Sequence, residues 1–103
     1  MKTIKGFDGL LSIHKQRPKA MGFFVDPNFV NEINCINNAT YYLSETRDED
    51  FDMDEMEDKY KTWLDYALFE DIIDNKLEHH PNATRDELLE AVVYYLEEDD
   101  FLD

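Results

Sequence analysis

The chain has 103 residues, of which 25 are acidic and ten are Lys or Arg, so its formal net charge is −15. This charge excludes nucleic acid and anionic membranes as direct partners, because phosphate contacts require Lys and Arg. The hydrophobic fraction of 43% is high enough for a folded core, which excludes a disordered acidic tail. We therefore expect a single domain over residues 1–103 with excess negative charge on its surface.

The charge is distributed unevenly along the chain. Residues 1–20 contain five Lys or Arg and one acid, whereas residues 44–103 contain 22 acids and five Lys or Arg. The densest acidic segment is 45–58, which holds nine carboxylates and one Arg. A compact protein with such a field repels itself, so the charge favours a positively charged partner.

The chain also carries indications of its compartment. Cys35 is the single cysteine, which excludes an intramolecular disulfide and is typical of a reducing environment. No segment approaches the ~20 apolar residues of a membrane-spanning helix, and the first residues lack the apolar core of a signal peptide. We therefore expect a cytoplasmic protein without a membrane partner.

The N-terminal half is predicted to contain one helix and two strands. Apolar spacing indicates a helix over about 7–17, which Pro18 ends. The segments 21–25 and 39–44 are rich in β-forming residues and are predicted strands. Between them, residues 26–38 fit either extended chain or one or two helical turns, and the pattern leaves both open.

The acidic segment 45–58 is expected to be either a loop or the start of a helix that continues through Tyr60 and Trp63. Its carboxylates begin like an EF-hand calcium loop, in which alternate residues ligate the ion. The pattern then fails, because Met53 replaces the turn glycine and Lys59 replaces the closing glutamate. We therefore predict no calcium site.

The C-terminal third is predicted to form two helices, at about 66–79 and 85–98. Asp65 is the expected N-cap of the first helix, and Thr84 with Glu87 forms a capping-box pattern at the start of the second. A short connection between amphipathic helices is typical of an antiparallel hairpin. The expected fold class is therefore α+β and rich in helix, with this hairpin supplying much of the core.

No pattern in the chain indicates catalysis. The three histidines, His14, His79 and His80, lack the convergent spacing of a zinc site. The three glycines match neither a phosphate-binding loop nor a dinucleotide-binding loop. We therefore expect a protein that is not an enzyme and that uses no metal or other cofactor.

Apolar side chains within and after the acidic segment indicate more than a solvated surface, which is the usual interpretation of clustered charge. Apolar anchors inside a charged field are typical of a protein interface, and here they are Phe51, Met53, Met56, Tyr60 and Trp63. The end of the chain has a similar composition, and we expect it to join the acidic segment in one negative surface. The predicted partner-binding residues are Asp48, Glu49, Asp50, Phe51, Asp52, Asp54, Glu55, Glu57, Asp58, Glu97, Glu98, Asp99, Asp100 and Phe101.

Two segments resemble a known family. Residues 64–75 read LDYALFEDIIDN, and residues 88–102 read LLEAVVYYLEEDDFL. Both are similar to a family of small acidic bacterial proteins that includes immunity proteins of contact-dependent growth inhibition and polymorphic toxin systems. The resemblance implies a cytosolic protein that binds and neutralises a toxin domain, often a nuclease. It supplies no residue-level site.

Two functions are consistent with these observations. The first is an immunity protein that places carboxylates where a basic nuclease toxin domain would bind phosphates. The alternative is a nucleic-acid mimic of the anti-restriction or anti-CRISPR type, which would use the same charge against a host DNA-binding enzyme. Mimics distribute carboxylates over a long surface, so their concentration in one segment favours the first function.

Overall fold

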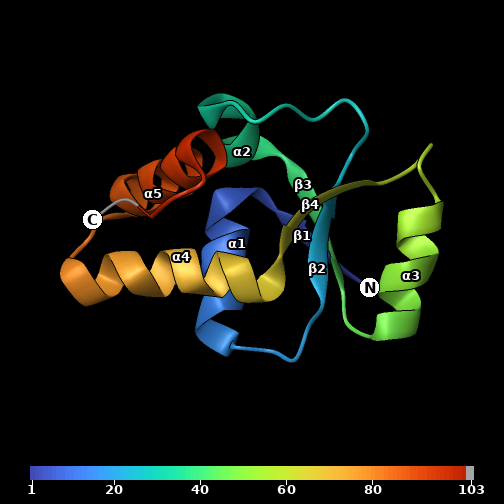
Figure 1. Ribbon diagram of the computed structural model, residues 1–103, viewed down its shortest axis with the longest axis horizontal. Helices are drawn as coiled ribbons and strands as arrows, with labels where there is room; N and C mark the ends of the chain where they lie inside the picture. Colours follow the sequence, from blue (N-terminus) through green and yellow to red (C-terminus); the bar gives the residue numbers. More distant parts are fainter. Residues whose placement is uncertain (102–103) are drawn as a thin grey trace.

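The computed structural model describes residues 1–101, which form an α+β fold (Figure 1). Over these residues there are five helices and a four-stranded antiparallel sheet. None of the helices in this range is long and apolar enough to cross a membrane. In chain order the elements are β1 (Lys2–Lys5), α1 (Gly6–Gln16), β2 (Gly22–Val25), α2 (Ile33–Asn38), β3 (Thr40–Ser44), α3 (Arg47–Glu55), β4 (Lys61–Asp65), α4 (Tyr66–His79) and α5 (Arg85–Glu98).

The sheet has the strand order β1-β3-β2-β4, and each strand is antiparallel to its neighbours. On the central strand β2, Phe23 pairs with Leu43 and Phe24 pairs with Tyr42 of β3. Because successive side chains of a strand point to opposite faces, Phe23 and Phe24 lie on opposite sides of the sheet. All four residues of β2 are buried, so this strand is covered on both faces.

Helices cover the two faces unequally. In Figure 1, α1, α2, α4 and α5 lie on one side of the sheet, and α3 lies alone on the other. The four-helix side holds the main apolar cluster, in which the rings of Phe23 and Phe69 are 5.3 Å apart and nearly perpendicular. On the α3 side, Phe24 and Met53 are buried but lie outside that cluster. The ring of Tyr60 packs against Phe24 there.

The predicted helix 7–17 and the predicted strands 21–25 and 39–44 are confirmed to within one residue by α1, β2 and β3. The undecided segment 26–38 contains a turn followed by α2.

The sequence analysis missed β1. Gly6, with a φ of +68°, lets this strand turn directly into α1. A side chain at Gly6 would also meet the Asn37 carbonyl oxygen at 3.0 Å. The strand β1 therefore passes into α1 at Gly6 without a separate turn segment that the sequence could indicate.

The acidic segment forms a helix, but this helix is shorter than the one expected to continue through Tyr60 and Trp63. Its helix α3 ends at Glu55, and Met56 has a non-helical φ of −90° and ψ of 58°. The expected continuation through Tyr60 and Trp63 is wrong, because Trp63 lies in β4. Carboxylates in the last turn of α3 face the negative end of the helix dipole, which opposes further helix.

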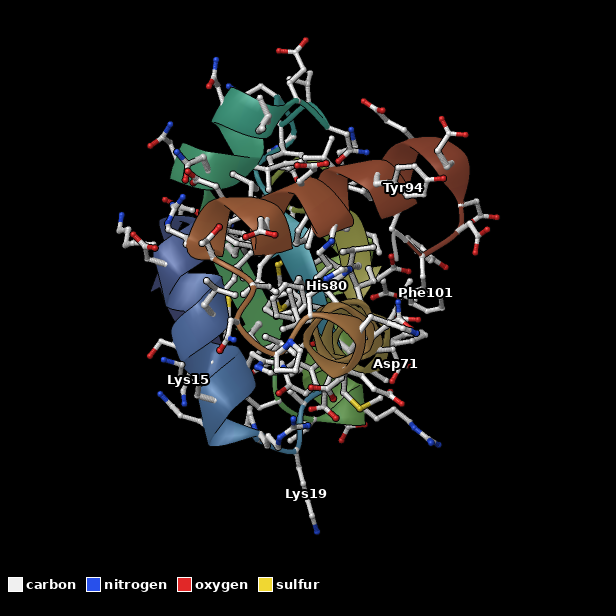
Figure 2. The ribbon with its side chains drawn as sticks, turned by 90° about the vertical axis from the view of Figure 1, so that its left-hand side faces the viewer. Lys15, Lys19, Asp71, His80, Tyr94 and Phe101 are labelled. Atoms are coloured by element: carbon white, nitrogen blue, oxygen red, sulfur yellow. The ribbon has the colours of Figure 1, made fainter. Side chains whose placement is uncertain are left out.

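The two predicted C-terminal helices are confirmed by α4 and α5. Thr84 Oγ1 accepts a hydrogen bond from the Glu87 amide, and the Thr84 amide donates to Glu87 Oε1, which completes the capping box. Asp65 occupies the N-cap position of α4, but its side chain makes no capping hydrogen bond. Figure 2 shows α4 end-on and α5 running across the view, so the helices cross steeply instead of lying antiparallel.

The attachment of α3 to the sheet depends on Met53, which is only 4% exposed. We predict that Met53→Ala lowers the free energy of unfolding by about 2 kcal/mol or more, because it leaves a cavity between helix and sheet. Urea denaturation measures the change. Phe51→Ala on the same helix is the control and should change stability by less than about 0.5 kcal/mol, since Phe51 is 63% exposed. Equal losses in both variants would contradict this packing.

Candidate functional site

The acidic segment forms a helix because Thr46 caps its first turn and because that turn carries negative charge, which the helix dipole favours. Thr46 Oγ1 accepts a hydrogen bond of 3.1 Å from the Glu49 amide. Asp48, Glu49 and Asp50 occupy the first turn, where carboxylates stabilise the positive end of the helix dipole. These local interactions place α3 with its polar side against Ser44 and its charged side toward solvent.

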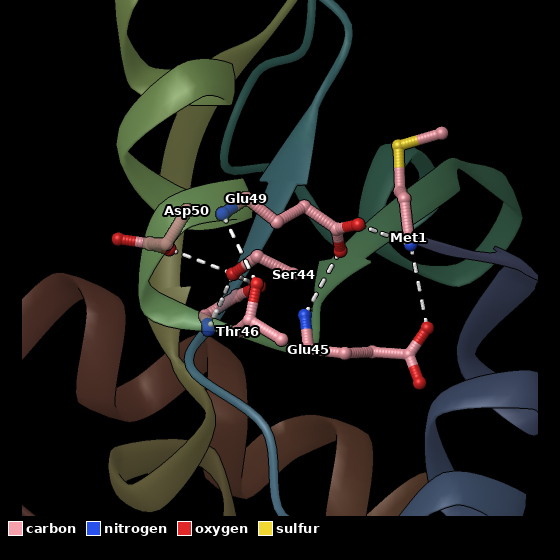
Figure 3. Close-up of polar contacts among 7 residues, drawn as sticks. Met1, Ser44, Glu45, Thr46, Glu49 and Asp50 are labelled. Atoms are coloured by element: carbon pink, nitrogen blue, oxygen red, sulfur yellow. Dashed lines mark hydrogen bonds and ion pairs between the residues drawn. The ribbon is translucent and has the colours of Figure 1, made fainter.

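Three of the predicted partner-binding carboxylates bind other parts of the protein, and Figure 3 shows the contacts of two of them, Glu49 and Asp50. Glu49 Oε2 lies 2.5 Å from the Met1 ammonium, and Glu49 Oε1 accepts a 3.0 Å hydrogen bond from the Glu45 amide. Asp50 Oδ1 lies 2.7 Å from the hydroxyl of Ser44. Asp54 Oδ1 accepts from the Thr62 hydroxyl of β4 at 3.1 Å. These carboxylates are therefore used to hold α3 in place.

The contact between Glu49 and Met1 changes the pKa of both groups. The Met1 ammonium lowers the pKa of Glu49 from its usual value, and the Glu45 amide lowers it further. The hydrogen bond to Glu49 raises the pKa of the ammonium. The pair therefore stabilises α3 between these two pKa values. It is lost as the pH falls through the lowered pKa of Glu49 or rises through the raised pKa of Met1.

The other three carboxylates of α3 and Phe51 form an exposed surface. Asp48, Phe51, Asp52 and Glu55 are all exposed, and we call them the outward face of α3. They are neighbours because residues three and four apart share one side of a helix. At 63%, the exposed fraction of Phe51 is the highest among the large hydrophobic residues of the described chain. Arg47, Asp48, Phe51 and Asp52 line a shallow depression there.

The acidic surface continues past the end of α3. Glu57 and Asp58 are exposed in the turn that follows the helix, and Met56 beside them is 41% exposed. A second depression is lined by Pro27, Asp54, Glu57, Tyr60, Lys61 and Thr62. Carboxylates therefore surround exposed apolar groups from Asp48 to Asp58.

Of the five predicted anchors, Met53 and Trp63 are not on this surface, and Tyr60 only borders it through the second depression. Met53 is buried against the sheet, and Tyr60 packs on Phe24. Trp63 packs against the main cluster, and its indole N–H donates to Asn31 Oδ1 at 3.0 Å. Only the exposure of each side chain, which the sequence does not show, separates them from Phe51 and Met56.

The acidic end of the chain lies far from α3. Glu97, Glu98, Asp99 and Asp100 are exposed, and Phe101 is 38% exposed with its ring 5.4 Å from that of Tyr95. Figure 1 shows α3 and α5 toward opposite ends of the longest axis, whose extent is 37 Å. The expectation of one continuous negative surface is therefore wrong. Leu102 and Asp103 of the predicted acidic end lie outside the described residues.

The described residues contain no group of three or more His, Cys, Asp and Glu side chains that could hold a metal ion. The segment that begins like an EF-hand is a regular helix, α3, and a helix cannot wrap its carboxylates around one ion as a loop does.

The sequence analysis missed a charged cluster that joins α1 to α4. Asp74 Oδ1 lies 2.8 Å from His14 Nε2 and 2.8 Å from Arg17 Nη2, and Asp74 Oδ2 accepts from Arg17 Nη1 at 3.1 Å. Arg17 Nη1 also lies 3.4 Å from Glu70. His14 is buried, and its partner Asp74 is 60 residues away along the chain, so no local pattern could have indicated the cluster.

The chain belongs to the family described as Domain of unknown function (DUF7716), whose model matches residues 10–103. No curated protein and no solved structure matches the chain.

The cluster around Asp74 predicts a pH-dependent stability. The Arg17 guanidinium, followed by His14, lowers the pKa of Asp74 below its usual value. The contribution of Asp74 is therefore present above the usual aspartate pKa and is lost as the pH falls through the lowered pKa. We expect Asp74→Asn to reduce the free energy of unfolding by up to about 1 kcal/mol at pH 7.

Urea denaturation at pH 7 and pH 3 measures this effect, and the difference between wild type and variant should narrow at the lower pH. Asp71→Asn, an exposed position on the same helix, is the control and should leave stability unchanged at both values. A difference that grows on acidification would contradict the assigned cause.

Proposed function

We propose that this protein is a non-enzymatic, cytoplasmic immunity protein that neutralises a basic toxin domain of the nuclease type by binding it through the outward face of α3. The observation that carries the proposal is the exposed ring of Phe51, surrounded by Asp48, Asp52 and Glu55 on a helix that lies alone on its side of the sheet. The resemblance of residues 64–102 to the immunity-protein family supplies the class of partner.

The proposed mechanism divides two tasks between the side chains. The carboxylates of the outward face attract a basic partner and occupy the positions of nucleic-acid phosphates in its cleft. Phe51 then supplies the apolar anchor that slows dissociation, because aromatic residues at the centre of an interface contribute most to affinity. Glu49, Asp50 and Asp54 contribute indirectly by holding α3 on the sheet.

The test begins with identification of the partner. The tagged chain is purified together with the product of the adjacent gene, and we expect a basic toxin domain whose nuclease activity it inhibits. The association rate and the dissociation rate are then measured at several salt concentrations. An affinity that does not change with salt would overturn the electrostatic part of the proposal.

Substitutions separate the effect of the carboxylates on the association rate from the effect of Phe51 on the dissociation rate. Neutralising Asp48, Asp52 and Glu55 together should slow association about tenfold at low salt with little change in dissociation. Phe51→Ala should instead accelerate dissociation about tenfold or more. The matched control neutralises Glu97, Glu98 and Asp100, which removes three charges at the opposite end of the molecule and should have a much smaller effect.

The alternative is a nucleic-acid mimic that inhibits a host DNA-binding enzyme. The observation that favours it is the placement of exposed acids at both ends of a molecule 37 Å long, close to the ~34 Å of one turn of duplex DNA. A mimic lying in a long basic groove would contact both ends. Equal losses from the α3 set and from the C-terminal set would therefore favour the mimic over the immunity protein.

A further inference from the structure

A groove lies between α1, α4 and the first residues of α5, on the face shown in Figure 2. Its volume of about 490 Å³ falls in the range of small-ligand sites. Its apolar lining comes from three elements and the loop before α5: Leu11, Ile73, Leu77, Ala83 and Leu88. Leu11 and Leu77 are only partly buried, so apolar surface remains open to a ligand.

The polar lining of this groove is entirely basic. It consists of His14, Lys15, Arg17 and Arg85, and no carboxylate lines the groove although the chain holds 25 acids. The depressions beside α3 are different, because Asp48, Asp52, Asp54 and Glu57 line them. The ionisable side chains that line this groove are therefore all basic, although the protein as a whole is acidic.

One of these basic side chains has no partner among the described residues. Arg17 binds Asp74 and Glu70, Arg85 binds Asp8, and His14 contacts Asp74. Within residues 1–101, Lys15 makes no hydrogen bond or ion pair, and it lies exposed on α1 at the rim of the groove (Figure 2). An incoming carboxylate can therefore pair with Lys15 without displacing an existing ion pair.

We infer that this groove binds a medium-chain aliphatic carboxylate, with its tail against Leu11, Leu77 and Leu88 and its carboxylate beside Lys15. An apolar lining with a basic rim matches both parts of such a molecule. The inference does not depend on the proposed function, since α3 lies on the other side of the sheet.

The test is a titration of the ¹⁵N-labelled full chain with butyrate, hexanoate and octanoate, followed by NMR. We expect saturable shifts at Leu11, Leu77 and Leu88, and a Kd that tightens about two- to fourfold for each added methylene. Octanol, which has the same tail without the charge, should bind about tenfold more weakly than octanoate. The absence of saturable shifts, shifts centred on α3, or no dependence on chain length would overturn the inference.

Two charge-reversal variants separate the groove from the overall charge. Lys15→Glu should weaken octanoate binding about tenfold or more, whereas Lys19→Glu, the same change at an exposed lysine that does not line the groove, should change it less than twofold. Leu77→Gln is a second groove variant and should reduce the dependence on chain length. Equal effects of the two lysine variants on octanoate binding would overturn the site. The site would also be overturned if the chain did not bind octanoate and Lys15→Glu instead changed its oligomeric state.

Discussion

The burial of β2 on both faces is the constraint on which the rest of the structure depends. Phe23 completes the main apolar cluster, so Phe24 must point to the other side, where it would be exposed without a cover. The helix α3, with Met53, supplies part of that cover. A helix rich in carboxylates is therefore held against the sheet by one buried side chain and by hydrogen bonds that its carboxylates accept from the hydroxyls of Ser44 and Thr62.

This attachment divides the acidic segment into two chemical groups. One group of carboxylates is held within the protein by the Met1 ammonium, by a backbone amide and by hydroxyl groups, of which only the ammonium neutralises charge. The other group remains exposed around Phe51 and produces the field that a basic partner would meet. The same division is visible near α1, where Asp74 and Glu70 neutralise Arg17 and leave Lys15 exposed. Charge at each surface thus depends on which ion pairs the fold completes.

Much of the secondary structure could be predicted because its signals are local. The capping box of Thr84 and Glu87 and the apolar spacing of α4 act within one or two helical turns, so both helices were located well. The strands β1 and β4 were missed because they are edge strands whose pairing partners lie far away in the chain. The steep crossing of α4 and α5 accompanies contacts of α4 with β2 and β4 and of α5 with α2, which a short loop does not reveal.

The sequence by itself determined the net charge, the concentration of acids after residue 44 and the capacity for a mixed helical and strand fold, because these depend on composition and local spacing. Only the tertiary structure decided which acids are exposed, that Met53 and Trp63 pack inward, and that the two acidic segments lie at opposite ends. The physical reason is that exposure and ion pairing depend on contacts between residues far apart in the chain. Asp74 with His14 and Glu49 with Met1 are examples of such contacts.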